Sequence, residues 1–331
     1  MLLKYGSYRP RGMRIIYILL LFMLSQYTGW SQVMVQRQAT LMGSVFSFTV
    51  VDVDSLLAER HIDSAILEIE RIENLISEWR PHTQVSAINR NAGIAPVRVD
   101  GELFELTRRA LLYSQMSEGA FDISIVALDK VWKFDGSMTE IPSEEVIRLS
   151  IAKVGYENIV LDSVEQTIFL RLTGMKIGFG SIGKGYAADK GREYLQQQGV
   201  RAGIVNASGD LATWGQQPDG KPWTVGINHP FKAHKMVKVL KMKEGAAATS
   251  GSYEKYAEIA GKRYAHIINP KTGYPSTGLT SVTVYGPSAE FANALSTSVM
   301  VLGAKKGKQL LRQFPQYQGV FISDTGKVRK P

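Results

Sequence analysis

The chain has 331 residues, no cysteine and a formal net charge of +9 at neutral pH. Without cysteine there can be no disulfide, no thiol catalysis, no thiolate metal site and no lipid attached to a thiol. The basic residues are scattered, so the charge does not indicate nucleic-acid binding. The length exceeds that of a typical domain, and we expect one large domain of two packed lobes.

The N-terminus has the pattern of a secretory signal. Basic residues precede an apolar run at residues 15–24, which is too short to span a bilayer. These basic residues are Lys4, Arg9, Arg11 and Arg14. Small residues at 29 and 31 suit a cut before Gln32. We therefore expect a signal peptide at 1–31, a functional domain at 32–331, and export to the periplasm or the outer face of the inner membrane. The alternative is an uncleaved membrane anchor.

The first half of the remaining chain alternates between strand and helix patterns. Residues 32–53 predict two strands around Met42. Apolar residues spaced three and four apart from Ile62 predict a long helix that ends near Pro81, with Trp79 in phase with its buried stripe. Further helices are predicted at about 102–117 and 143–153, and strands at 159–161 and 167–172.

The second half is mostly strand. A helix is predicted from the glycine-rich segment at 178–185 to about Gln198. Two helices, near 289–301 and 305–314, precede a final strand at 319–322. Other strands are predicted at 203–206, 223–227, 236–240, 246–249, 264–268 and 280–285. Strands separated by hairpin-length links predict an α+β fold with antiparallel sheets and flanking helices.

The glycine-rich segment is the strongest local signal. Glycines at 178, 180, 183 and 185 precede a helix, an arrangement that lets backbone N–H groups approach a phosphate. Residues 178–184 fit the first seven positions of the Walker A pattern. Gly185 then stands where that pattern needs Ser or Thr to bind magnesium. We therefore disfavour a P-loop-like nucleotide hydrolase.

Four other loops concentrate polar and glycine residues. They are Gly119–Asp122, Asn206–Asp210, the pair of segments at 249–253 and 264–275, and the helix start at 292–297. Together, and in this order, these segments resemble the ApbE family of FAD:protein FMN transferases over nearly the whole mature chain. The matching motifs are Thr83–Asn89, Gly119-Ala120-Phe121-Asp122, Lys184-Gly185-Tyr186-Ala187 with Asp189, and His266–Gly273.

The resemblance implies a single domain of two packed lobes, related to the T-fold, that uses FAD as substrate and magnesium as cofactor. FMN would pass to a Thr or Ser hydroxyl of an acceptor protein through a phosphodiester, and AMP would leave. The acceptor would be a membrane-associated electron-transfer subunit. No nucleic-acid partner is expected. Association with a membrane is expected only if the N-terminal segment is not cleaved.

The resemblance also assigns site residues. Flavin or adenine contacts fall on Met42, Trp79, Ala120, Phe121, Asp122, Gly178, Lys184 and Ile267. Trp79 and Phe121 offer faces for stacking. Three of these residues have structural alternatives. Trp79 could be core, Asp122 could cap a turn, and Lys184 could be a solvated helix residue.

The resemblance assigns catalysis and metal binding to a further set of residues. His266 is our candidate base, with a structural hydrogen bond to the Asn269 turn as the alternative. Metal ligands would be the Ser181 carbonyl, Asn293 and Thr297, the last two one helical turn apart.

Two positions depart from the resemblance. The family usually has Asp at the positions of Gly178 and Asn293, so two expected carboxylates near the pyrophosphate are missing. Asn can offer a carbonyl oxygen to magnesium but no charge. An FAD-binding protein, or an FAD pyrophosphatase that transfers nothing, is therefore the second interpretation.

Overall fold

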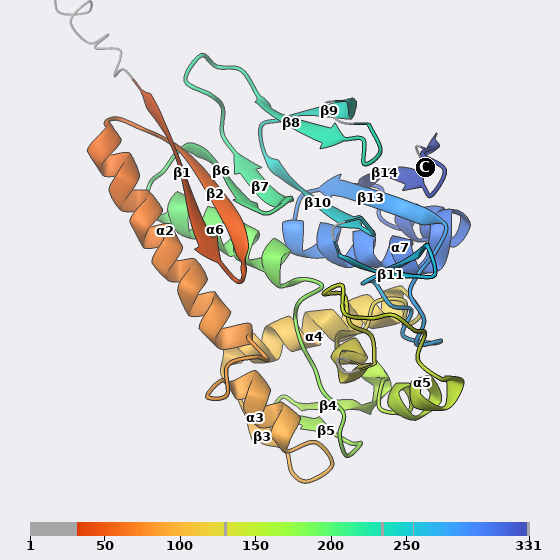
Figure 1. Cartoon of the computed structure of the whole chain (residues 1–331). Coiled ribbons are helices and arrows are strands. Elements are labelled where there is room, and N and C mark those ends of the chain that lie inside the picture. The colour runs from red at the N-terminus through yellow and green to blue at the C-terminus, as the bar shows by residue number, and fades with distance from the viewer. Residues whose placement is uncertain (1–31, 129–130, 233–234, 254, 330–331) are drawn as a thin grey trace, which may run out of the picture.

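Figure 1 shows the computed structural model, which describes residues 32–128, 131–232, 235–253 and 255–329. The segment predicted to be a signal peptide lies outside these ranges. An antiparallel sheet of eight strands forms one lobe. Its strands are, in spatial order, β1 (Val33–Leu41), β2 (Ser44–Asp52), β6 (Ala202–Ala207), β7 (Asp210–Trp214), β10 (Gly245–Gly251), β13 (Leu279–Gly286), β14 (Gln318–Ser323) and β15 (Val328–Arg329).

The predicted pair of strands around Met42 forms the β1–β2 hairpin. Met42 and Gly43 both have positive φ, at 52° and 68°. A two-residue turn of this kind matches the twist of antiparallel strands. The β6–β7 hairpin turns in the same way through Ser208 and Gly209. This second turn makes Asp210 the first residue of a strand rather than the end of a polar loop.

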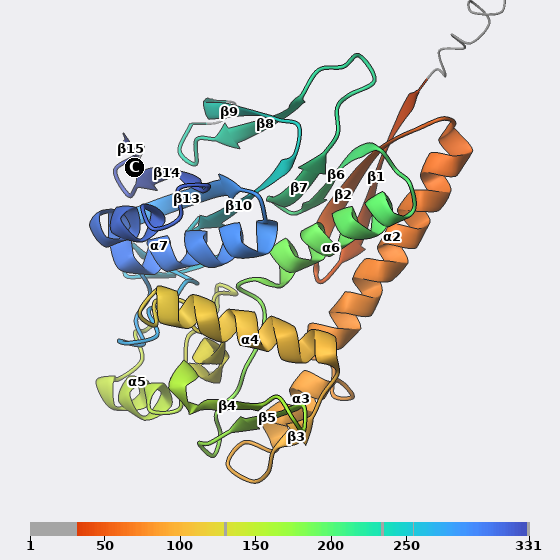
Figure 2. The ribbon, with the colours of Figure 1, turned by 180° about the vertical axis from the view of Figure 1, so that it is seen from behind.

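Helices α2 (Ser55–Ile76), α6 (Gly183–Gln197) and α7 (Ala289–Leu311) cover one face of this sheet (Figure 2). The predicted stripe of α2 is buried, and the Asp54 side chain caps the helix by accepting from the Leu57 N–H at 2.8 Å. The two helices predicted near the C-terminus form α7, with a kink at Gly303, whose φ is 74°. No described helix is long and apolar enough to cross a membrane.

Trp79 does not belong to the buried stripe of α2. The helix ends at Ile76, and Ser77 has extended backbone angles. The Ser77 carbonyl accepts a hydrogen bond from Thr83 Oγ1 at 2.7 Å, and Pro81 disfavours a helical residue before it. The chain therefore turns away, and the Trp79 side chain is 77 % exposed. Its interpretation as a core residue is wrong.

The second lobe lies below the helices in Figure 1. It comprises α3 (Gln84–Arg90), α4 (Gly101–Met116), α5 (Glu144–Ile151), two 3-10 helices η1 (Ile123–Leu128) and η2 (Tyr156–Asn158), and a small sheet of β3 (Val97–Arg98), β5 (Thr167–Leu170) and β4 (Ile159–Asp162). One continuous core joins the lobes, with Phe48 and Ile69 from the first and Leu106 and Ile168 from the second. The predicted α+β domain of two packed lobes is confirmed.

Two hairpins complete the molecule. One hairpin, β8 (Trp223–Asn228) with β9 (Met236–Met242), packs on the face of the large sheet opposite the helices, where Ile227 and Leu240 meet Leu211 and Val320. The other pairs β11 (Tyr256–Ile259) with β12 (Lys262–Ala265). The strand predicted at 264–268 ends at Ala265, so His266 and Ile267 lie in the loop that follows it.

Candidate functional site

The glycine loop, residues 177–181, crosses from one lobe to the other. The strand before it, β5, belongs to the small sheet, and α6 after it packs on the large sheet. The Asn89 side chain on α3 holds the loop by two bonds to Ile177, donating to its carbonyl at 2.9 Å and accepting from its N–H at 2.8 Å. Gly178 N–H donates to the Ile123 carbonyl at 3.0 Å. Asn89 thus positions the loop, a role that its motif membership alone did not reveal.

Gly178 offers only backbone, as its sequence indicates. A Cβ at this position would lie 2.9 Å from the carboxyl carbon of Glu78 and 2.9 Å from its Oε1. Burial raises the pKa of Glu78, opposed by a bond from its own backbone N–H. A carboxyl group therefore does lie beside the glycine loop, but it comes from the chain after α2.

Gly185 is required by helix packing. A Cβ on Gly185 would lie 2.4 Å from the Ala289 carbonyl oxygen and 2.7 Å from its carbonyl carbon. Because these are backbone atoms, they cannot rotate away as a side chain could. Ser or Thr does not fit here, so the metal-binding hydroxyl of a Walker A motif has no place in this fold.

The three predicted metal ligands lie on the loop before α6 and on α7. The Asn293 side-chain amide lies between the Ser181 carbonyl oxygen and Asp210 Oδ2. With its NH₂ group facing them, the amide donates to these oxygens at 2.9 and 3.2 Å. Thr297, one turn along α7, contacts Ser250 Oγ through its Oγ1 at 3.2 Å. The structure thus brings Ser181 and Asn293 into contact.

Asp210 is the site residue that sequence reasoning missed. It begins β7, and its side chain is almost fully buried. Its Oδ1 accepts from the Thr249 N–H at 3.2 Å. The sequence signal was an acid directly after a tight turn, in a segment noted only as a polar loop.

The donor set suits a hard cation. Carbonyl, amide, hydroxyl and carboxylate oxygens are ligands of the kind magnesium takes, and magnesium is usually held by only one or two carboxylates. Among the described residues, no three His, Asp or Glu side chains gather as for a transition metal. The residues present therefore fit magnesium better than they fit zinc or iron.

In the segment Ala120–Asp122, the side chains of Phe121 and Asp122 are buried and contact other parts of the protein. Phe121 is fully buried and meets the Tyr113 ring edge-on at 6.1 Å, so it has no free face for stacking. Asp122 Oδ1 accepts from the Ser124 N–H and hydroxyl at 2.8 and 2.6 Å, and its Oδ2 accepts from the Tyr156 N–H. The turn-capping interpretation of Asp122 explains these bonds. A ligand contact from this segment, including Ala120, stays a prediction.

Met42 is at the tip of the β1–β2 hairpin, and a Cβ on Gly183, at the start of α6, would lie 3.4 Å from its methyl carbon. Its N–H donates to Glu73 Oε2 at 3.0 Å. A hollow of about 470 Å³ is lined there by Met42 and its neighbours Thr40, Leu41 and Gly43, with Glu70, Glu73, Asn74 and Arg80. Arg80 directly follows the exposed Trp79. Met42 therefore lines a hollow, and Trp79 is exposed next to Arg80, another of its lining residues; contact with flavin stays a prediction for both.

His266 is half-buried and has one clear partner. Its Nδ1 lies 3.0 Å from the Lys255 carbonyl oxygen. Burial lowers the pKa of His266, and the charges of Lys255 and Lys184 lower it further, against that hydrogen bond. The imidazole is thus neutral near pH 7. Its partner is the Lys255 carbonyl, not the Asn269 turn that the structural interpretation named.

Ile267 follows His266 in the loop after β12, and Lys184 of α6 is close to His266. The Ile267 carbonyl accepts from the Ser276 N–H at 2.8 Å. Within the described ranges, Ser276 Oγ is the buried side-chain oxygen that has no hydrogen-bond partner in the protein. Such a group is satisfied by water or by a ligand. Lys184, in the first turn of α6, is half-buried and close enough to influence His266 electrostatically.

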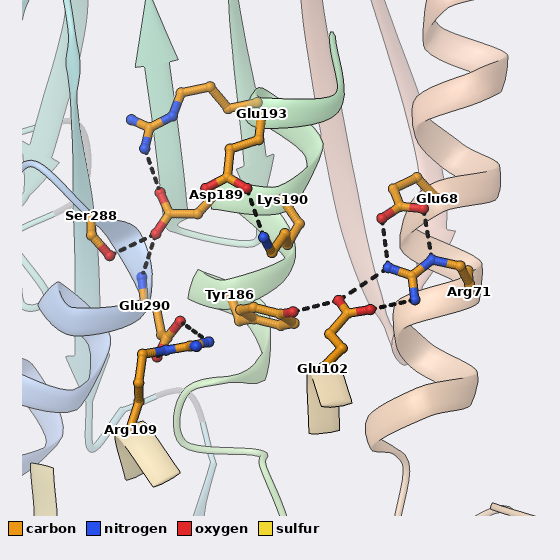
Figure 3. A network of polar contacts seen from close by, with 11 residues as sticks. Glu68, Arg71, Glu102, Arg109, Tyr186, Asp189, Lys190, Glu193, Ser288 and Glu290 are labelled. Carbon is orange, nitrogen blue, oxygen red and sulfur yellow. Dashed lines mark hydrogen bonds and ion pairs between the residues drawn. The ribbon is translucent and has the colours of Figure 1, made fainter. Parts of the chain in front are cut away.

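A network of charged residues fixes α6 against its neighbours (Figure 3). The Asp189 carboxylate accepts from Ser288 Oγ at 2.8 Å and from the Glu290 N–H at 3.0 Å, at the start of α7. Glu290 in turn accepts both guanidinium donors of Arg109 on α4, at 2.8 and 2.9 Å. These bonds hold the helix that carries Asn293 in place beside the glycine loop.

Comparisons with known proteins agree with this geometry. The ApbE family profile matches residues 42–321. An FAD:protein FMN transferase of Klebsiella pneumoniae is 34% identical over 86% of this chain and 88% of its own length. One from Treponema pallidum is 30% identical over 82% and 80%.

Solved structures show the same fold. The ApbE protein of Thermotoga maritima superposes with a TM-score of 0.83 at 28% identity, covering 90% of this chain and 97% of its own. The apo flavinyl transferase ApbE of Pseudomonas stutzeri gives 0.80 at 28% identity, covering 90% and 95%. The chain therefore belongs to the ApbE family and is a transferase.

Proposed function

We propose that this protein transfers FMN from FAD to a threonine or serine hydroxyl of an acceptor protein. The names of its relatives support this reaction. The observation that carries the proposal is the convergence of the Ser181 carbonyl, Asn293 and Asp210 beside the glycine loop. These oxygen groups at a helix N-terminus suit a magnesium-bound pyrophosphate.

The reaction is a phosphoryl substitution. The acceptor hydroxyl oxygen bonds to the phosphorus of the FMN half, and the bond from that phosphorus to the bridging oxygen breaks. AMP leaves with the bridging oxygen, and the hydroxyl proton passes to a base. The product is a phosphodiester between FMN and the acceptor. Such a reaction depends mainly on positioning and on neutralising phosphate charge.

His266 is suited to take the proton. A carbonyl oxygen can only accept, so the contact with Lys255 places the imidazole proton on Nδ1. Nε2 then carries the lone pair. Because its pKa is lowered, the imidazole is available as a base at neutral pH.

Charge on the pyrophosphate would be met from three directions. Magnesium, when bound, would neutralise phosphate charge, and Ser181, Asn293, Thr297 and Asp210 would hold it. No described side chain caps the first turn of α6, so its backbone N–H groups after Gly183, whose own N–H donates to the Phe179 carbonyl, remain for a phosphate at the same end. Lys184, in that turn, adds a positive side chain.

Hydrolysis of FAD without transfer is the second candidate. It is favoured by the neutral amide at Asn293, where the resemblance leads one to expect an acid. The P-loop-like hydrolase is disfavoured by the packing of Gly185 on Ala289.

The site of action follows from the N-terminus. If residues 1–31 are a signal, the protein acts outside the cytoplasm, and its acceptor would be an exported or membrane-associated electron-transfer subunit. Fractionation of cells that express the full chain with a C-terminal tag tests this. A cytoplasmic, uncleaved protein would contradict it.

The reaction is tested with residues 32–331, FAD, magnesium and a flavin-acceptor domain. Flavin fluorescence on the acceptor in a denaturing gel, with AMP released in equal amount, is the expected result. AMP without a fluorescent acceptor would indicate the pyrophosphatase. A flavin-bound protein that releases no AMP would indicate a binding protein only.

A further inference from the structure

Three elements that are distant in the sequence meet at Asn293. Its amide reaches the Ser181 carbonyl from α7 across the loop before α6, and Asp210 at the start of β7 faces the same amide. The turn before Asp210 is tight, and the Asp210 side chain is 1 % exposed. A bond from the Thr249 N–H on β10 directs one carboxylate oxygen. The other oxygen, Oδ2, is directed at Asn293.

The charges of these groups are unequal. A backbone carbonyl, an amide and the hydroxyl of Thr297 are polar but neutral. Asp210 is the carboxylate that faces the Asn293 amide, and its Oδ2 is directed at the side of that amide where the Ser181 carbonyl lies. A divalent cation placed among neutral oxygens alone would lack the anionic ligand that magnesium sites normally include.

The Asn293 amide can be oriented in two ways, one suited to the protein without metal and one to the protein with a bound cation. With NH₂ turned inward, it donates to Ser181 and Asp210 at 2.9 and 3.2 Å, and its nitrogen lies between two oxygens, as a cation would. With the amide rotated by half a turn, its own oxygen points at the same place. The first orientation suits the protein without metal, and the second adds a ligand for a cation.

We propose that Asp210 is the charge-bearing ligand of the divalent-cation site, and that Asn293 holds the site closed with its NH₂ group until the cation binds. This inference rests on the proposed magnesium-dependent function. It assigns the negative charge to β7 instead of α7. A neutral amide at position 293 suits the metal-free protein, because a second carboxylate so close to Asp210 would be repelled there.

The test measures Mn²⁺ binding to residues 32–331 by electron paramagnetic resonance, with and without FAD and with no acceptor present. Asp210→Asn should weaken Mn²⁺ binding about 10- to 100-fold. Asn293→Asp alone should tighten it. The double variant, Asp210→Asn with Asn293→Asp, should recover most of the lost affinity because one carboxylate is returned to the site.

Thermal unfolding supplies an independent readout. In EDTA, Asn293→Asp should lower Tm, and Mn²⁺ should restore it. Asp52→Asn is the matched control: it removes another largely buried aspartate, which pairs with His61 on α2 at 2.7 Å, and it should change Tm but not Mn²⁺ affinity. If Asp210→Asn fails to fold, the EDTA-dependent change in Tm of Asn293→Asp still decides whether the two side chains share a site.

Each outcome decides the proposal. Unchanged Mn²⁺ affinity in Asp210→Asn, no recovery in the double variant, or no Mn²⁺ binding by the unaltered chain would overturn it. If Mn²⁺ binding depends on Asp210 but no FMN reaches any acceptor, the cation site stands and the proposed transfer fails.

Discussion

Charged side chains gather at two places around α6. On the side facing α7 and α4, Asp189, Glu290 and Arg109 satisfy one another through short hydrogen bonds. At the N-terminal end, Glu78 lies beside Gly178, Asp210 accepts from the Thr249 N–H and faces the Asn293 amide, and His266 Nδ1 contacts the Lys255 carbonyl. The first group joins three helices to one another, whereas the second brings side chains from separate strands and loops to the glycine loop. Pairing across helices thus marks the structural group in this molecule, and convergence on one loop marks the candidate site.

The largest effect is expected at the ligand side. His266→Ala should lower the rate of transfer about 10³-fold while FAD binding changes little. Activity of the unaltered protein should fall as pH drops through the pKa of His266, below about 6.5, because protonation removes the lone pair. Single-turnover kinetics across pH, with FAD affinity measured in parallel, check this.

Imidazole added to the His266→Ala variant provides the control, since it should restore part of the rate. An equal loss of FAD binding and transfer would make His266 a binding residue instead.

The next effect is expected in the structural network. Glu290→Gln should lower the free energy of unfolding by about 3 kcal/mol, because Arg109 and Tyr113 both donate hydrogen bonds to the Glu290 carboxylate and the variant removes its negative charge. Urea unfolding measures it. Glu105→Gln breaks an exposed ion pair with Arg108 and should cause no measurable change. Similar losses in both variants would remove the distinction between the network and the surface.

Helix contact gives a third, smaller effect. Gly185→Ser should lower the free energy of unfolding by about 2 kcal/mol, because its Cβ meets the Ala289 carbonyl. It would also complete a Walker A pattern, yet no ATP hydrolysis should appear. Gly180→Ser, where a Cβ meets nothing within 4 Å, should leave stability unchanged. ATPase activity in Gly185→Ser would contradict our account of the loop.

The smallest effect is expected at Glu78. Its folded-state pKa is raised, so the ionised carboxylate destabilises the fold above that pKa. Glu78→Gln should therefore increase the free energy of unfolding slightly at about pH 8, and the gain should shrink as pH falls towards about 5 and the carboxyl becomes protonated. Urea unfolding at both pH values, with exposed Glu70→Gln as control, measures it. A loss of stability at pH 8 would show that Glu78 has a stabilising partner.

The sequence predicted best the elements whose apolar residues recur with a regular period. Alternation in the sequence revealed β2, whose first half has buried Phe46 and Phe48 between more exposed residues, and spacing by three and four revealed α2, which has one buried face. Strand β7 was missed because all five of its residues are buried, which leaves no alternation. Helix α3 was missed because its seven residues are too few to show a period.

The candidate site was less predictable, because its contacts are long-range. Asn89 meets the glycine loop across 88 positions, and Asp210 meets Asn293 across the sheet and α7. No local pattern records either contact. Periodicity suggested that Trp79 is core, but α2 ends before it and leaves it exposed, whereas the resemblance suggested a stacking face for Phe121, which the core between the lobes encloses.

The close approach of Gly185 to Ala289 also bears on how this site can evolve. A side chain at position 185 would meet main-chain atoms of α7, so a substitution there must move α6 and α7 apart, and with them the loop that carries Ser181 and the helix that carries Asn293. In the cation site that we propose, a paired substitution would instead move the negative charge between positions 210 and 293 without changing this helix contact.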